Sequence, residues 1–198
     1  MRHFPLAVLL AAAALLPGPA SLSAQVVRSD PTGFHAAGYL QGAGIMFEED
    51  DEAESGGGVG LALGWGLSRT VTLYAEAAGA QVEMQDVNDT YTLAHVDLGA
   101  RFHFRGPEAK ALPYLTVGLT GRAAELDLLG DPFTITGAGV SFGGGVLVFL
   151  SRKAALDLGV KWTAGSFKEA EYLGEKADID ASATSARVSI GLAWWAGR

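Results

Sequence analysis

The chain has 198 residues, a formal net charge of −8 and no cysteine, so neither a disulfide nor a cysteine-based zinc site can form. The acidic balance argues against a basic nucleic-acid-binding face, and we expect no nucleic-acid partner. Hydrophobic residues make up 49 % of the chain, yet only the N-terminus has a long apolar run, and 27 glycines would each destabilise a helix by about 1 kcal/mol relative to alanine.

The N-terminus has the order of a secretory signal peptide. Arg2 supplies a positive charge, the apolar stretch from Leu6 to Leu16 follows, and small residues precede Gln25. This stretch is shorter than the roughly 20 residues that a transmembrane anchor needs; a buried N-terminal helix is the alternative. We predict a signal peptide over residues 1–24, a periplasmic N-terminal lead over residues 25–33 and a single barrel domain over residues 34–196.

Eight segments alternate apolar and polar residues with a period of two, as β-strands do. In the clearest of them Val96 and Leu98 fall on one face and Asp97 on the other. The segments are longer than the roughly 5–6 residues of an average soluble strand and match the about 9–11 residues that cross a bilayer. They are residues 34–47, 57–67, 70–82, 91–104, 112–124, 137–150, 153–167 and 184–196.

The connections between these segments alternate in length. Short turns at 67–70, 105–111 and 150–153 alternate with long loops at 48–56, 83–90, 125–136 and 168–183, and the loops carry 17 of the 22 acidic residues. Short periplasmic turns and long extracellular loops are typical of outer-membrane barrels. We therefore predict an all-β fold, an eight-stranded antiparallel up-and-down transmembrane β-barrel. A soluble barrel is the alternative, because alternation alone does not say which face points inward.

Large aromatic side chains favour the membrane barrel. They fall on the apolar face near the strand ends, where the two interfaces of a bilayer would lie. The predicted belts consist of Phe47, Phe142 and Trp162 at one end, and Trp65, Phe102, Phe104 and Trp194 at the other.

Three segments resemble the strand and turn signatures of OmpA-like and OmpX-like small outer-membrane β-barrels. They are residues 64–73 (GWGLSRTVTL), 112–119 (LPYLTVGL) and 149–156 (FLSRKAAL), and the resemblance covers roughly residues 34–195. It implies a place in the outer membrane, contact with lipid and lipopolysaccharide, and assembly by the barrel-insertion machinery. Such chains commonly end on an aromatic residue, whereas Trp195 is followed here by Ala196-Gly197-Arg198.

Charged residues on the polar face predict a filled lumen, since eight strands leave room only for side chains. Glu76 and Asp97 fall on one wall, and Lys161 and Arg187 on the opposite wall. We predict a charged network of these four that Arg101, Arg122 and Asp157 extend. Inward glycines (Gly60, Gly64, Gly143 and Gly145) would leave space for the long side chains.

The sequence leaves the role of the barrel open between three classes. A structural or surface-interaction role through the acidic loops, with an unknown extracellular ligand, agrees with a filled lumen that is not a general diffusion pore. A narrow gated ion channel is the second possibility, and a lipid-modifying enzyme is the third. We expect that the protein is not an enzyme, because no Ser/His pair can be placed from sequence. We also expect no cofactor or metal, because the acidic first loop lacks a calcium-loop pattern. We expect a monomer.

Overall fold

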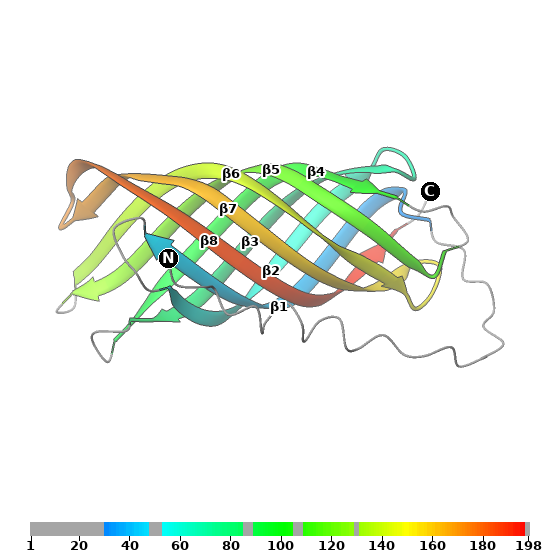
Figure 1. The fold of residues 1–198 in the computed structure, drawn as a ribbon, viewed down its shortest axis with the longest axis horizontal. Coiled ribbons are helices and arrows are strands. Elements are labelled where there is room, and N and C mark those ends of the chain that lie inside the picture. Colours follow the sequence, from blue (N-terminus) through cyan, green and yellow to red (C-terminus); the bar gives the residue numbers. More distant parts are fainter. Residues whose placement is uncertain (1–29, 48–52, 85–88, 105–108, 129–130, 197–198) are drawn as a thin grey trace, which may run out of the picture.

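Eight antiparallel strands close into one barrel in the computed structural model, which describes residues 30–47, 53–84, 89–104, 109–128 and 131–196 (Figure 1). Each strand pairs with the next in sequence, and β1 pairs with β8 to close the ring. The predicted fold class is confirmed. The strands are β1 (Gly33–Phe47), β2 (Glu54–Gly66), β3 (Val71–Glu83), β4 (Thr90–His103), β5 (Ala111–Leu128), β6 (Asp131–Phe149), β7 (Ala154–Tyr172) and β8 (Glu175–Trp195).

The predicted signal peptide lies outside the described residues, as does most of the predicted lead; the last residue of that lead, Gly33, is the first of β1. No helix among the described residues is long and apolar enough to span a membrane.

Two of the short turns are built in the same way around a serine. The Ser68 hydroxyl accepts hydrogen bonds from the backbone N–H groups of Thr70 (3.2 Å) and Val71 (3.1 Å). The Ser151 hydroxyl accepts from those of Lys153 (3.3 Å) and Ala154 (3.1 Å). A serine side chain that bonds to the backbone two and three residues later favours a tight turn. The Leu-Ser pairs of the sequence therefore hold two hairpins at one end of the barrel.

Strands β5 to β8 are longer than the sequence predicts. The predicted loop over 125–136 is mostly strand, and β7 and β8 fill the predicted loop over 168–183 except for the two residues Leu173 and Gly174. These strand ends project beyond β1 to β4, as the orange tip of the β7–β8 hairpin shows in Figure 1. These segments are rich in charged residues, which led to their prediction as loops, although Ile135, Ile179 and Ala181 mark an inward apolar face.

The outer surface of the barrel is aliphatic and its interior is polar at mid-height. This is the inverse of a soluble barrel, in which the apolar face turns inward. Exposed apolar side chains cover the outside of every strand, among them Leu40, Val59, Leu61, Leu63, Leu73, Val96, Leu98, Leu115, Val117, Leu119, Val140, Val188, Ile190 and Leu192.

Apolar clusters occupy the lumen at both ends. At the loop end they comprise Ile45, Val82, Tyr91, Leu93, Ala124, Phe167 and Ala183. At the turn end they comprise Leu112, Tyr114, Leu147, Phe149, Ala155, Ala193 and Trp195. The charged residues thus lie between two apolar layers, which limit the access of water to them.

Candidate functional site: the charged lumen

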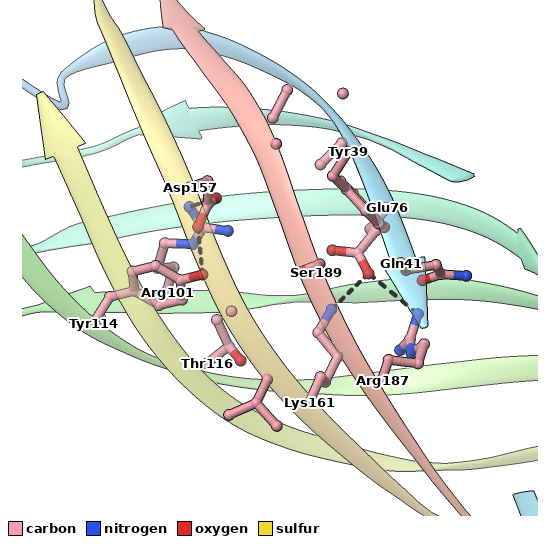
Figure 2. A pocket seen from close by; sticks show the side chains of 16 residues that line it. Tyr39, Gln41, Glu76, Arg101, Tyr114, Thr116, Asp157, Lys161, Arg187 and Ser189 are labelled. Atoms are coloured by element: carbon pink, nitrogen blue, oxygen red, sulfur yellow. Dashed lines mark hydrogen bonds and ion pairs between the residues drawn. The ribbon is translucent and has the colours of Figure 1, made fainter. Parts of the chain in front are cut away.

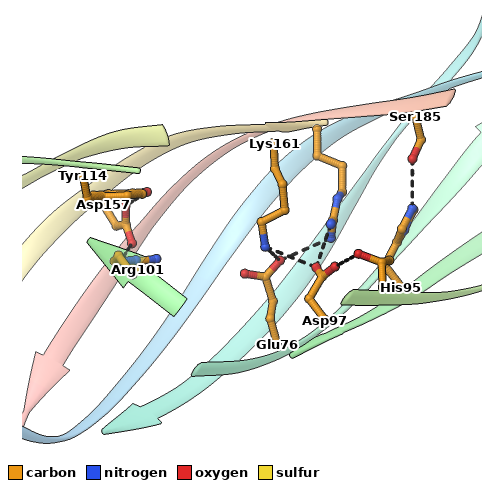
Figure 3. A network of polar contacts seen from close by, with 10 residues as sticks. Glu76, His95, Asp97, Arg101, Tyr114, Asp157, Lys161 and Ser185 are labelled. Carbon is orange, nitrogen blue, oxygen red and sulfur yellow. Dashed lines mark hydrogen bonds and ion pairs between the residues drawn. The ribbon is translucent and has the colours of Figure 1, made fainter. Parts of the chain in front are cut away.

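Four charged side chains meet across the middle of the lumen (Figure 3). The Lys161 ammonium lies 2.8 Å from Glu76 and 3.2 Å from Asp97. The Arg187 guanidinium lies 3.2 Å from Glu76 and 2.6 Å from Asp97. Each cation therefore contacts both carboxylates, as the placement on opposite walls leads one to expect.

The barrel register positions these four groups in two pairs. Glu76 and Asp97 are directly paired on β3 and β4, and Lys161 and Arg187 are directly paired on β7 and β8. Two like charges side by side on one wall repel each other, and the opposite wall supplies the compensating pair. The Asp97 side chain is fully buried, and the Thr120 hydroxyl donates a further hydrogen bond to it.

Arg101 and Asp157 form a second group nearer the turn end. Their ion pair is 3.0 Å long, and the Tyr114 hydroxyl donates a 2.6 Å hydrogen bond to the same carboxylate. The Arg101 guanidinium also lies 4.1 Å from the centre of the Tyr114 ring, a cation–π contact. The predicted network did not include Tyr114, although its position on the polar face of β5 is the signal that would have placed it.

Arg122 is separate from both groups, so it does not extend the network as predicted. Its guanidinium donates a 3.1 Å hydrogen bond to the Ala183 carbonyl and lies 4.8 Å from the centre of the Phe167 ring. It lies two residues nearer to the loop end than Thr120, beside the apolar cluster there. Among the described residues no carboxylate pairs with it.

Glycines give the inward rings their space. A Cβ on Gly60 would lie 2.3 Å from the Tyr39 ring, and one on Gly145 would lie 2.5 Å from the Tyr114 hydroxyl. A Cβ on Gly64 would lie 2.7 Å from the imidazole of His35. The prediction that inward glycines leave space for large side chains holds for aromatic rings at Gly60, Gly64 and Gly145. Gly143 instead lies against the backbone of β7.

A cavity of about 40 Å³ separates the two charged groups (Figure 2). Tyr39, Gln41 and Ser189 line it together with Glu76, Lys161 and Arg187 on one side and Arg101 and Asp157 on the other. Because a water molecule needs about 10–15 Å³ of such volume, the cavity has room for about three. It is far too small for a nutrient molecule.

A histidine and a serine do meet in the lumen, although sequence reasoning could not place such a pair. The His95 Nε2 atom lies 3.3 Å from the Ser185 hydroxyl, and both residues are buried. The other ring nitrogen of His95 has no partner among the described residues, so no carboxylate orients the ring as in a serine-hydrolase triad. No group of three possible metal ligands occurs in the part of the chain that the structure describes.

Most of the predicted belt residues lie on the outer surface. Trp65, Phe102, Phe104 and Trp194 are exposed near the turn end. Phe142 stacks on Trp162 at 5.7 Å further along the outer wall. The prediction for Phe47 is wrong: its ring lies 5.8 Å from that of buried Phe167 and packs on the apolar cluster at the loop end. Phe47 shares the inward parity of Ala43 and Ile45.

A closed antiparallel barrel with an aliphatic outer wall and ion pairs inside defines the class of integral membrane β-barrels. The family model described as "Outer membrane protein beta-barrel domain" matches residues 7–192, and the chain belongs to this family.

Several solved structures are similar to the chain. Neisserial surface protein A has a TM-score of 0.68 and 16 % identity, over 82 % of this chain and 97 % of that chain. OprG from Pseudomonas aeruginosa has a TM-score of 0.60 and 12 % identity, over 85 % and 98 %. Ail, the attachment invasion locus protein of Yersinia pestis, has a TM-score of 0.53 and 10 % identity, over 82 % and 99 %. Identities this low show the fold alone. No curated protein matches the sequence.

Proposed function

We propose that this protein is a closed outer-membrane barrel that acts at the cell surface through its loop end and does not serve as a general diffusion pore. The observation that carries the proposal is the lumen itself, in which Lys161 and Arg187 contact both Glu76 and Asp97 between two apolar clusters. A solute would have to separate four ion-pair contacts and displace both clusters in order to pass.

Two further observations support a role at the loop end. The long strand extensions and several exposed acidic residues lie there, and binding residues are found disproportionately on surface loops that a rigid scaffold holds. Two structurally similar proteins have names that describe surface or attachment proteins. We place this end outside the cell and the serine turns in the periplasm, since short turns face the periplasm in such barrels.

Conductance in planar lipid bilayers tests the closed lumen. We expect the purified, refolded protein to give no steps of the size that a general porin gives, and Glu76→Ala or Lys161→Ala to remain equally silent. Asp180→Asn, in an exposed ion pair outside the lumen, is the matched control. Stable pore-sized conductance from the wild-type protein would contradict the proposal.

A narrow gated ion path is the second candidate, and the cavity between the two charged groups favours it. Arg101 and Lys161 both line this cavity, so either cation could exchange carboxylate partners across it. If small, brief steps occur in the wild type and their frequency changes in Glu76→Ala, the gated path replaces the closed barrel. Silence in both proteins excludes it.

We further propose that the barrel is a monomer in contact with outer-membrane lipid and lipopolysaccharide and is inserted by the barrel-insertion machinery. Its ring closes through the β1–β8 pairing, which leaves no free strand edge within the aliphatic zone. Light scattering of the detergent-solubilised protein, corrected for bound detergent, should give the mass of one chain.

A further inference from the structure

Two of the short turns share one sequence and one geometry. Residues 67–69 join β2 to β3, residues 150–152 join β6 to β7, and both segments read Leu-Ser-Arg. In each turn the leucine and serine N–H groups donate to the carbonyl four residues after the leucine. These acceptors are Val71 (3.0 and 3.2 Å) and Ala154 (2.9 and 3.1 Å). Because β2–β3 and β6–β7 are four strands apart in a ring of eight, the two turns lie on opposite sides of the barrel.

Each turn presents an apolar side chain and then a cation. Leu67 and Leu150 continue the outward parity of their strands and are exposed, as on the rest of the aliphatic wall. Arg69 and Arg152 are exposed two positions later, and neither has an ion-pair partner among the described residues. The arginines therefore lie where the aliphatic wall ends, with their guanidinium groups unpaired.

An exposed tryptophan lies beside each of these turns. Trp65 precedes Leu67 by two residues on the outer face of β2. Trp194 of β8 is paired with Ala154, the residue at which β7 leaves the second turn. Tryptophan side chains concentrate at the headgroup level of a membrane. The two arginines are thus next to the residues that mark this level.

The turn end carries an excess of exposed positive charge. Its exposed cations are Arg69, Lys110, Arg152 and Lys153, whereas Asp30 is the one exposed acid described at this end. Lys153 is partly engaged, because its ammonium donates a 3.3 Å hydrogen bond to the Ala196 carbonyl. The loop end is the reverse, since exposed carboxylates outnumber exposed lysines there. An anionic surface is therefore attracted to the turn end and repelled by the loop end.

We propose that the two Leu-Ser-Arg turns bind the phosphate groups of anionic phospholipids in the periplasmic leaflet. The leucine contacts the acyl chains, and the arginine reaches the headgroup, where its fork of N–H groups matches a phosphate. The serine hydroxyl bonds hold both turns in the shape that presents these side chains. The inference rests on the proposed lipid contact and on the periplasmic position of the turns, and it specifies the lipid class.

Quenching of Trp65 and Trp194 measures which lipid lies against the turn end. Trp162→Phe removes the tryptophan further along the outer wall, and Trp195 is buried in the lumen, away from lipid. The protein with this substitution is refolded into phosphatidylcholine vesicles that contain brominated phosphatidylglycerol or, at the same mole fraction, brominated phosphatidylcholine. We expect stronger quenching by phosphatidylglycerol at low salt, equal to about threefold to fivefold local enrichment, and its loss at about 1 M salt.

The double variant R69Q/R152Q should abolish this enrichment, because it keeps the leucines and serines of both turns and removes the two cations. The matched double variant K168Q/K176Q, at exposed lysines of the loop end, should keep the enrichment of the parent protein.

A single variant separates the two sites. With Trp194→Phe added, Trp65 is the reporter and R69Q should remove the preference for phosphatidylglycerol. With Trp65→Phe added instead, Trp194 is the reporter and R69Q should leave the preference unchanged, because the second turn lies on the opposite side of the barrel.

Equal quenching by the two brominated lipids, or an enrichment that persists in R69Q/R152Q, would overturn the proposal. Either result would leave the lipid contact and the closed lumen intact, because brominated phosphatidylcholine reports contact without regard to charge and conductance is measured separately. If neither brominated lipid quenched Trp65 or Trp194, the membrane position of the turn end would be rejected together with the lipid preference.

Discussion

Asp97 lies at the centre of the lumen network. Its two carboxylate oxygens accept from the Lys161 ammonium, the Arg187 guanidinium and the Thr120 hydroxyl, and its side chain is fully buried. Both cations also contact Glu76, but a single carboxylate cannot balance two buried positive charges. The stability of the lumen should therefore depend on Asp97 more than on any exposed acid.

Asp97→Asn should lower the free energy of unfolding by about 3–5 kcal/mol, because it leaves excess positive charge in a buried site. Urea-induced unfolding in lipid vesicles, followed by tryptophan fluorescence, measures this change. Asp180→Asn removes an exposed ion pair and should cost less than about 1 kcal/mol. Equal effects of the two substitutions would show that the lumen pairs do not stabilise the fold.

At the scale of the strand, small residues on β6 and β7 allow the large inward rings to fit. Gly145 of β6 lies beside Tyr114 of β5. A Cβ added to Gly159 of β7 would lie 2.8 Å from the Tyr114 hydroxyl. Tyr114 in turn holds Asp157 in place for Arg101. The glycines thus act on the second charged group through the tyrosine.

Gly145→Ala should destabilise the barrel by about 1–3 kcal/mol, because the added methyl would lie 2.2 Å from the Leu158 carbonyl oxygen as well as against Tyr114. Gly42→Ala is the matched control, since nothing lies within 4 Å of the added carbon on that outward-facing glycine. The same vesicle unfolding assay compares the two, and the control should be neutral or slightly stabilising. A neutral Gly145→Ala would contradict the tight packing around Tyr114.

At the scale of the whole molecule, the barrel is inverted relative to a soluble protein. Its outer wall exposes leucine, valine and isoleucine from all eight strands, and its charges point inward. Such a surface is stable only in an apolar solvent, which agrees with the outer-membrane family.

Leu98→Arg should therefore lower the free energy of unfolding in vesicles by about 2–4 kcal/mol, the cost of a cation near the middle of a bilayer. Leu98 is 62 % exposed on the outer wall. Leu173→Arg is the control, because Leu173 is 65 % exposed at the hairpin tip, beyond the aliphatic wall. If both substitutions were neutral, the outer wall would face water and the membrane assignment would fail.

The period-two alternation by itself determined the strand count, the approximate positions of the strands and the face on which the residues in the middle of each strand lie. Parity also placed Glu76 and Asp97 opposite Lys161 and Arg187, because strands three and seven are diametric in a ring of eight. These conclusions need only local geometry and the order of the strands, both of which the chain encodes directly.

Only the tertiary structure decided at which height in the barrel each side chain lies, how deeply it is buried and which side chains it contacts. The stagger between strands places Arg122 beside Phe167 and away from the carboxylates, and brings His95 to Ser185. The extended ends of β5 to β8 are held beyond the aliphatic zone by backbone pairing and by Ile135, Ile179 and Ala181, which pack on the apolar cluster at the loop end. Alternation does not encode these contacts, because it fixes the face on which a side chain lies and not the stagger between strands.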